Sequence, residues 1–192
     1  AKDGQDGGND YWRGTLVYDN QFAKPEFDAE KECVYLQFHG VNASAKVMLN
    51  GKEVVAHDGG YSTFRVDVTK DLQENNQIKI EVDNSVNDRV YPQKADFTFY
   101  GGIYRDIEIL VVSKEHFDLD YYGGPGMKYQ TEVDGKDATV KVSTYINKAA
   151  KEAKAKVVVE LLDAEGNLVA EEEGTEVELS VSNVHLWDGL ED

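Results

Sequence analysis

The stretch from Asp88 to Val112 reads DRVYPQKADFTFYGGIYRDIEILVV, and it decides how the rest of the chain is interpreted. Its first half is a polar and aromatic loop, whereas the half that follows Gly101-Gly102 alternates like a β-strand. Two adjacent glycines at a strand entrance indicate positive φ or a close backbone approach. One face of the predicted strand holds Ile103, Ile107, Ile109 and Val111, and the other holds Tyr104, Asp106 and Glu108.

The loop has the composition of a carbohydrate site. Aromatic rings offer an apolar platform for the C–H faces of a sugar, and a carboxylate accepts hydrogen bonds from its hydroxyls. The loop supplies both groups, in Tyr91, Asp96, Phe97, Phe99 and Tyr100.

Short alternating segments separated by turn signals surround this stretch. Residues 33–39 alternate clearly, and Asn50-Gly51 is the strongest hairpin signal, because both central residues of a type I′ turn need positive φ. A first strand is predicted at 11–18, a connection at 20–29 and a turn at Asn75-Asn76. Short strand patterns separated by turns, with no long segment of 3.6-residue periodicity among them, predict an all-β sandwich.

A second series of strand patterns begins after the glycine-rich segment 121–126. The Lys- and Ala-rich segment 147–154 could form a helical turn within it or serve as a solvated connection. Strands are predicted near 138–146, 155–161, 168–170 and 177–181.

The composition excludes several classes of function. A formal net charge of −17 argues against nucleic acid and anionic membranes as partners, because both attract Lys and Arg. No apolar run approaches the roughly 20 residues of a membrane span. The single cysteine, Cys33, is interpreted as a small strand residue, and the four scattered histidines lack zinc-ligand spacing. Acidic charge and the lack of a disulfide fit a bacterial periplasm or cytoplasm, and the choice between them stays open.

Several sequence blocks, in this order, resemble the sugar-binding domain of family 2 glycoside hydrolases, the β-galactosidase, β-glucuronidase and β-mannosidase relatives. The blocks lie at 38–42, 47–54, 59–61, 64–68, 82–84, 91–92, 96–97 and 101–106. The resemblance covers roughly Tyr11 to Phe117. It implies a flexible lead-in at 1–10 and a jelly-roll-like, galactose-binding-like β-sandwich at 11–118. Residues 119–192 would then form a truncated immunoglobulin-like β-sandwich that is incomplete at its C-terminus.

The resemblance also implies where chemistry takes place. Glycoside hydrolysis uses two carboxylates, which in this family lie on a (β/α)₈ barrel of about 250 residues. The sequence contains no such pattern, so no catalytic residue is assigned, and the chain alone is expected to be inactive. The full enzyme would hydrolyse O-glycosidic bonds and be most like a β-galactosidase, with the chain bracing its barrel.

By position, Asp96 resembles the aspartate that contacts the sugar in β-galactosidase-like members and, in some, a monovalent cation. Asn84 is a second candidate, and Phe97 or Phe99 would pack nearby. No cofactor is expected in the chain itself, although a monovalent or divalent cation could belong to the full-length enzyme. Equally, Asp96 could cap a loop while the aromatic rings fill the seam between domains.

Several alternatives stay open. Arg105 is expected to pair with a neighbouring carboxylate rather than with an anionic sugar. Trp12 and Tyr61 could stack on sugar, but these two residues and Trp187 are expected in cores. The chain could instead be an autonomous carbohydrate-binding module or a structural or adhesion protein. Its expected partners are carbohydrate, bound weakly, and its own catalytic barrel, together with a second copy paired through the strand edges of the truncated domain.

Overall fold

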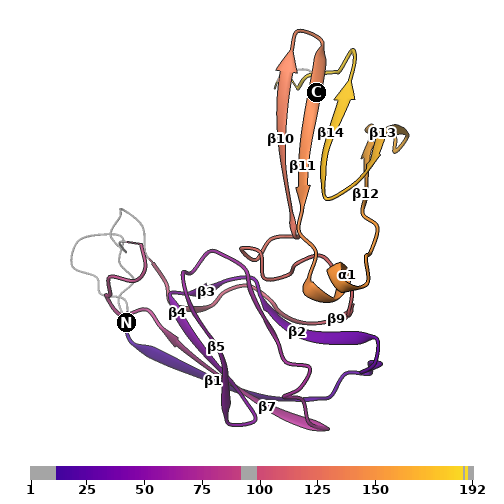
Figure 1. Cartoon of the computed structure of the whole chain (residues 1–192). Helices are drawn as coiled ribbons and strands as arrows, with labels where there is room; N and C mark the ends of the chain where they lie inside the picture. Colours follow the sequence, from indigo (N-terminus) through magenta and orange to yellow (C-terminus); the bar gives the residue numbers. More distant parts are fainter. Residues whose placement is uncertain (1–11, 92–98, 188, 190–192) are drawn as a thin grey trace, which may run out of the picture. The chain divides into compact units, whose positions relative to one another are not determined.

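A computed structural model describes residues 12–91, 99–187 and 189 of the chain. It divides into two compact units, residues 1–114 (unit 1) and 115–192 (unit 2), which are treated separately below. Fourteen strands and one short helix are assigned within the described residues, which confirms the prediction of an all-β chain (Figure 1). None of the helices in this described part is long and apolar enough to cross a membrane.

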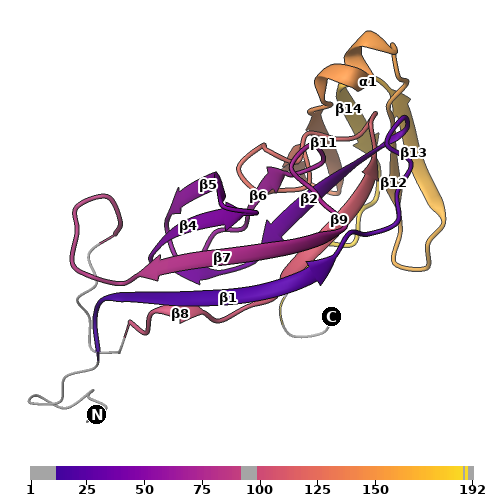
Figure 2. The ribbon, with the colours of Figure 1, turned by 90° about the horizontal axis from the view of Figure 1, so that it is seen from below.

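Unit 1 is a sandwich of antiparallel sheets. The four-stranded sheet has the order β1 (Thr15–Ala23), β7 (Asn75–Asp83), β4 (Ser44–Leu49), β5 (Lys52–Asp58), and Figure 2 shows β1 along its edge. The three-stranded sheet has the order β6 (Phe64–Asp67), β2 (Glu32–Phe38), β9 (Ile107–Ser113). A short pair, β3 (Val41–Asn42) and β8 (Gly102–Ile103), joins them.

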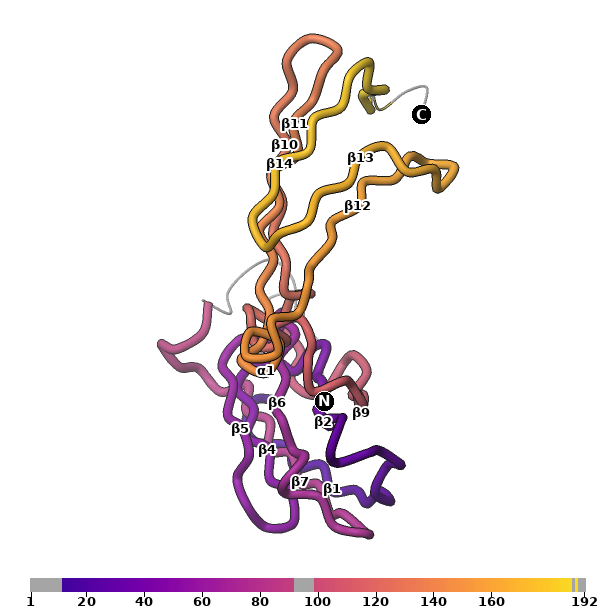
Figure 3. The backbone as a smooth tube through the Cα atoms, turned by 45° about the vertical axis from the view of Figure 1, so that its right-hand side comes forward, coloured from indigo at the N-terminus to yellow at the C-terminus, as the bar shows by residue number. Residues whose placement is uncertain are grey.

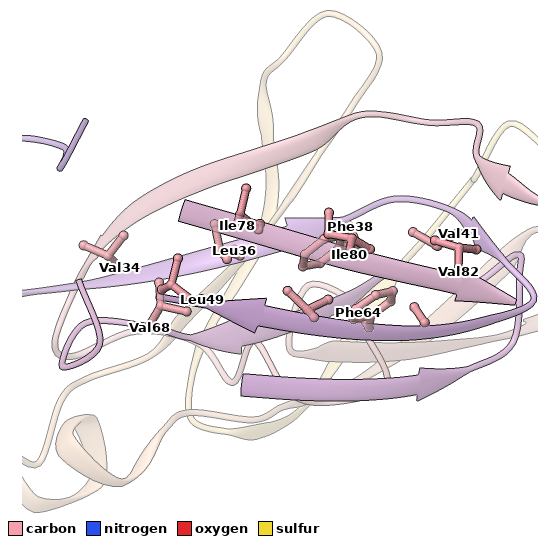
Figure 4. Packing of buried hydrophobic residues seen from close by; sticks show 12 residues of the cluster. Val34, Leu36, Phe38, Val41, Leu49, Phe64, Val68, Ile78, Ile80 and Val82 are labelled. Carbon is pink, nitrogen blue, oxygen red and sulfur yellow. The ribbon is translucent and has the colours of Figure 1, made fainter. Parts of the chain in front are cut away.

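The core of unit 1 lies between these sheets because every second residue of their strands is apolar. Phe38 of β2 is fully buried and stacks on Phe64 of β6, with ring centroids 4.6 Å apart (Figure 4). Each fully buried side chain of this size stabilises the fold by about 1.5–3 kcal/mol. The cluster comprises Val34, Leu36, Phe38, Val41, Ala45, Val47, Leu49, Phe64, Val68, Ile78, Ile80 and Val82.

The hairpin between β4 and β5 forms at the predicted turn. Asn50 and Gly51 have φ of 52° and 83°, as a type I′ turn requires. The Asn50 side chain also accepts a hydrogen bond from the Gln77 backbone N–H at 3.0 Å and donates to the Asp71 carbonyl at 2.9 Å. The turn is therefore fixed to the neighbouring strand as well as by its own conformation.

Three local predictions in unit 1 were wrong. β1 continues through residues 20–23, predicted as a connection, because Ala23 still pairs with Asn75 of β7. Asn75-Asn76 begins β7 rather than forming a turn, and the buried Asn76 side chain bonds the backbone of Gln73. The strand predicted after Gly101 is split into β8 and β9, since β8 pairs with β3 whereas β9 pairs with β2.

Unit 2 contains five strands and the helix α1 (Lys148–Glu152), whose N-cap is Asn147. The helical turn that the Lys- and Ala-rich segment could form is thus present. Figure 3 follows the two hairpins along the backbone. One sheet has the order β10 (Met127–Asp134), β11 (Asp137–Thr144), β14 (Glu176–Val181), and the other pairs β12 (Val158–Leu162) with β13 (Leu168–Glu173). Its immunoglobulin-like character stays a prediction.

Candidate carbohydrate-facing site

Three tyrosines and one phenylalanine from separate segments of unit 1 form a tyrosine cluster, defined as Tyr61, Tyr91, Phe99 and Tyr104. Tyr61 stacks on Tyr91 with centroids 5.2 Å apart, and its ring lies 6.1 Å from that of Tyr104 in an edge-on arrangement. Tyr91 lies 6.2 Å from Phe99. Tyr61 and Tyr104 are about half exposed, whereas Phe99 is buried, so the cluster presents aromatic surface on a buried base.

Asn42 of β3 is the polar centre beneath the cluster. It is 2% exposed, and its Oδ1 accepts a hydrogen bond from Tyr91 Oη at 2.7 Å while its Nδ2 donates to the Tyr100 carbonyl at 2.7 Å. Tyr104 Oη donates to the Gly60 carbonyl. A Cβ at Gly60 would lie 2.3 Å from Asn42 Oδ1, so only glycine fits there. These contacts hold three segments of the chain in one arrangement.

The hydroxyls of Tyr91 and Tyr104 in the cluster have raised pKa values and stay protonated near neutral pH. Burial raises the pKa of Tyr91 to about 12, with the neighbouring Tyr61 hydroxyl contributing in the same direction. Burial also raises the pKa of Tyr104. Both groups are therefore neutral hydrogen-bond donors near neutral pH.

The side chain of Asn84 bonds backbone groups of the segment before β1. It is 2% exposed; its Oδ1 accepts from the Gly14 N–H at 2.8 Å and its Nδ2 donates to the Trp12 carbonyl at 3.2 Å. A Cβ at Gly101 would lie 2.6 Å from Asn84 Cγ, which explains the first glycine of the Gly-Gly pair. Asn84 thus joins the start of β1 to the loop before β8, and its predicted contact with sugar stays a prediction.

The other predicted site residues divide into two groups. Phe99 belongs to the cluster, whereas Asp96 and Phe97 lie outside the described residues. In the sequence, residues 92–98 directly connect the cluster members Tyr91 and Phe99. No group of three or more His, Cys, Asp or Glu within the described part of the chain could hold a metal ion.

Several aromatic and charged residues differ from expectation. Tyr61, Trp12 and Trp187, predicted in cores, are 54%, 56% and 81% exposed. The guanidinium of Arg105 lies 5.5 Å from the centroid of the Tyr104 ring, an interaction that the carboxylate-pair prediction did not include. Asn42 was not predicted as a site residue, and in the sequence it is one polar residue within the block at 38–42.

A second polar surface lies on the outer face of the four-stranded sheet. Asp58 Oδ1 accepts from Ser44 Oγ at 2.6 Å and its Oδ2 accepts from Arg89 Nε at 3.1 Å. The Ser44 hydrogen bond, followed by those of Arg89, lowers the pKa of this carboxyl group. None of the described residues that line this surface is a tyrosine, phenylalanine or tryptophan, so it offers a sugar less apolar ring surface than the tyrosine cluster does.

The antiparallel β-sandwich of unit 1, with aromatic loop side chains at its surface, is the architecture predicted for a galactose-binding-like domain. Residues 9–125 match the family model described as the glycosyl hydrolase 2 galactose-binding domain-like family, and the chain belongs to that family. It corresponds to a non-catalytic, N-terminal part of these enzymes.

Similar proteins support this assignment. A β-glucuronidase of Bacteroides fragilis is 29% identical over 100% of this chain and 29% of its own length. A β-galactosidase of Thermoanaerobacter pseudethanolicus is 29% identical over 69% of this chain and 18% of its own. The crystal structure of an FMN-binding β-glucuronidase from Faecalibacterium prausnitzii L2-6 superposes with a TM-score of 0.83 and 33% identity, over 95% of this chain and 29% of that one. The chain thus spans about three tenths of the length of these glucuronidases.

Proposed function

We propose that this chain is the supporting sandwich of a longer polypeptide that hydrolyses β-glycosidic bonds. The relatives that match it are named β-glucuronidases and β-galactosidases, and each is several times longer. The catalytic carboxylates would lie on a barrel outside the chain, which the sandwich braces. Whether the sugar is a glucuronide or a galactoside depends mainly on that barrel.

The chain also contributes one surface to the sugar subsite of this longer polypeptide. The observation that carries this proposal is the tyrosine cluster, which presents the half-exposed rings of Tyr61 and Tyr104 and whose members Tyr91 and Phe99 flank residues 92–98 in the sequence. Asp96 would accept hydrogen bonds from sugar hydroxyls, and Phe97 would pack beside the ring. In the full-length enzyme Asp96 could also be a ligand of a monovalent cation.

The test is Asp96→Ala in the longer polypeptide. A hydrogen bond to a charged group contributes about 1.5–3 kcal/mol, so kcat/KM for an aryl β-glycoside should fall about tenfold to a hundredfold. Asp88→Ala is the matched control, because Asp88 is an exposed acid of the same loop, and it should leave kcat/KM unchanged. Equal kinetics of Asp96→Ala and the unmodified enzyme would refute the sugar contact.

The isolated chain separates this proposal from an autonomous carbohydrate-binding module. As part of an enzyme, it should show no turnover of aryl glycosides and only weak binding, because most of the pocket wall is absent. Titration calorimetry against galactosides, glucuronides and mannosides measures that binding. Micromolar affinity for one of them would favour the binding-module function instead.

Self-association through unit 2 is a further part of the proposal. Tyr129 and Val133 of β10 are 72% and 51% exposed, and an exposed apolar strand invites pairing with another chain. Light scattering across a concentration series tests this, and a monomer at every concentration would count against it.

A further inference from the structure

The sandwich of unit 1 is open along one side. A groove of about 700 Å³ lies there, and its lining is mainly apolar. Ile107 and Ile109 of β9 face the same layer as the buried Leu36, with which Ile109 is paired, yet Ile109 remains 40% exposed. The lining residues from the four-stranded sheet are Tyr18, Asp19, Asn20, Phe22, Ile78 and Ile80.

The backbone of β9 shows which edge is unused. The His39 N–H bonds the Asp106 carbonyl, and the Lys114 N–H bonds the Lys31 carbonyl. Every second residue of β9, counted from Asp106 to Lys114, therefore points its backbone N–H and C=O groups toward β2. The intervening residues Ile107, Ile109 and Val111 therefore point their N–H and C=O groups to the opposite edge. No strand within the described residues pairs there.

The opposite wall of the groove is also an edge strand. β1 pairs with β7 alone in the described structure, and Tyr18 Oη accepts a hydrogen bond from the Ile103 N–H at 3.3 Å, which links β1 to β8. The opening thus combines partly exposed apolar side chains with a row of unpaired backbone groups. That combination suits an extended peptide that adds to a sheet edge, because it offers main-chain bonds and alternating side-chain contacts.

We propose that a further β-strand of the same polypeptide, outside these 192 residues, pairs with the free edge of β9 and fills this groove. Its chemistry follows from the site: an extended segment of about seven residues with an apolar residue at every second position. The relatives are more than three times longer than the chain, so segments able to supply it exist in such polypeptides. The inference rests on the part of the proposed function that places the chain in a longer polypeptide, and it does not depend on sugar binding.

Thiol accessibility tests the proposal. Ile109→Cys is made in the 192-residue chain and in the longer polypeptide, and alkylation by iodoacetamide is followed peptide by peptide with mass spectrometry, so the native Cys33 stays in place. A strand over the groove should slow alkylation at position 109 at least about tenfold in the longer polypeptide. Val86→Cys is the matched control, because Val86 is 84% exposed and does not line the groove, and it should react equally in both.

Amide hydrogen exchange of the unmodified proteins provides a second measurement that needs no variant. The amides of Ile107, Ile109 and Val111 should exchange rapidly in the 192-residue chain and become as protected as those of Glu108 and Leu110 in the longer polypeptide. Rapid alkylation and exchange in both proteins would overturn the proposal. Slow alkylation in the 192-residue chain, accompanied by dimers in light scattering, would also overturn it and assign the groove to a second copy. Either result leaves the Asp96 experiment unaffected.

Discussion

The two units are built from similar strands but differ in what they bury. In unit 1 the two sheets enclose a cluster of twelve residues, including the fully buried Phe38 and Val47. In unit 2 the buried apolar residues of the described part are Val142, Ala150, Val157 and Leu179, and grooves of about 570 and 800 Å³ lie beside its sheets. Alternation therefore forms strands in both units, whereas a core requires enough strands on both sides of it.

The strand β10 makes this difference concrete. Every one of its residues is exposed, although its sequence alternates and its register with β11 is regular over eight pairs. Burial of apolar surface is the dominant favourable term in folding, so strands that pair without a second layer are weakly stabilised. Unit 1 should consequently unfold with the larger free energy, and the predictions below test that ranking.

The largest expected effect is the truncation of a core aromatic side chain in unit 1. Phe38→Ala removes a fully buried ring that stacks on Phe64, and such changes cost about 3–5 kcal/mol of unfolding free energy. Tyr129→Ala is the matched change in unit 2, where the ring is 72% exposed, and it should cost no more than about 0.5 kcal/mol. Urea unfolding followed by residue-resolved NMR measures both. Similar losses would show that unit 2 has a core that its exposed strands do not suggest.

A smaller effect is expected from a single hydroxyl of the tyrosine cluster. Tyr104→Phe removes the hydrogen bond to the buried Gly60 carbonyl and should cost about 1–3 kcal/mol, because an unsatisfied acceptor remains. Tyr121→Phe is the counterpart in unit 2, where the hydroxyl bonds only the Tyr145 hydroxyl at 3.3 Å, and its cost should be smaller. Thermal unfolding of the two variants compares them. An equal loss of stability in the two variants would mean that the Tyr104 hydrogen bond stabilises unit 1 no more than the Tyr121 hydrogen bond stabilises unit 2.

How far the sequence predicts this molecule depends on whether a feature is local. The alternation of Val34, Leu36 and Phe38 is enough to predict a buried strand. The preference of Asn50-Gly51 for positive φ is enough to predict the turn. The extension of β1 to Ala23 and the start of β7 at Asn75 depend on each other, because they are paired, and neither segment shows this by itself. A pattern read along one sequence does not show which segments pair when they lie far apart in the chain.

The candidate site shows the same limit. The loop after Asp88 was predicted from its aromatic and acidic composition, and Tyr91 and Phe99 of that loop do belong to the cluster. Asn42 and Tyr61 could not be assigned to it in advance, because they reach it from other segments through tertiary contacts. Asp96 and Phe97 lie outside the described residues, so their roles rest on the family resemblance and on the proposed kinetics.

The smallest expected effect is an acid sensitivity of unit 1 that arises from His57 in β5. Its ring stacks on Phe64 with centroids 4.3 Å apart, and burial lowers its pKa below the ordinary value of 6.5. A lowered pKa means that the folded state disfavours the proton, so the unfolded state binds it first as the pH falls. The contribution of His57 to stability is therefore complete above 6.5 and declines as the pH drops from there toward the folded pKa.

Replacement by glutamine isolates this contribution. The difference in unfolding free energy between the unmodified protein and His57→Gln should be constant above about pH 7.5 and should shrink between about pH 6.5 and pH 5. NMR probes of unit 1 should report the change, while probes of unit 2 should give the same unfolding transition for both proteins. A difference that stays constant down to about pH 5 would mean that His57 has the same proton affinity in the folded and unfolded states, so that burial beside Phe64 does not disfavour its charged form.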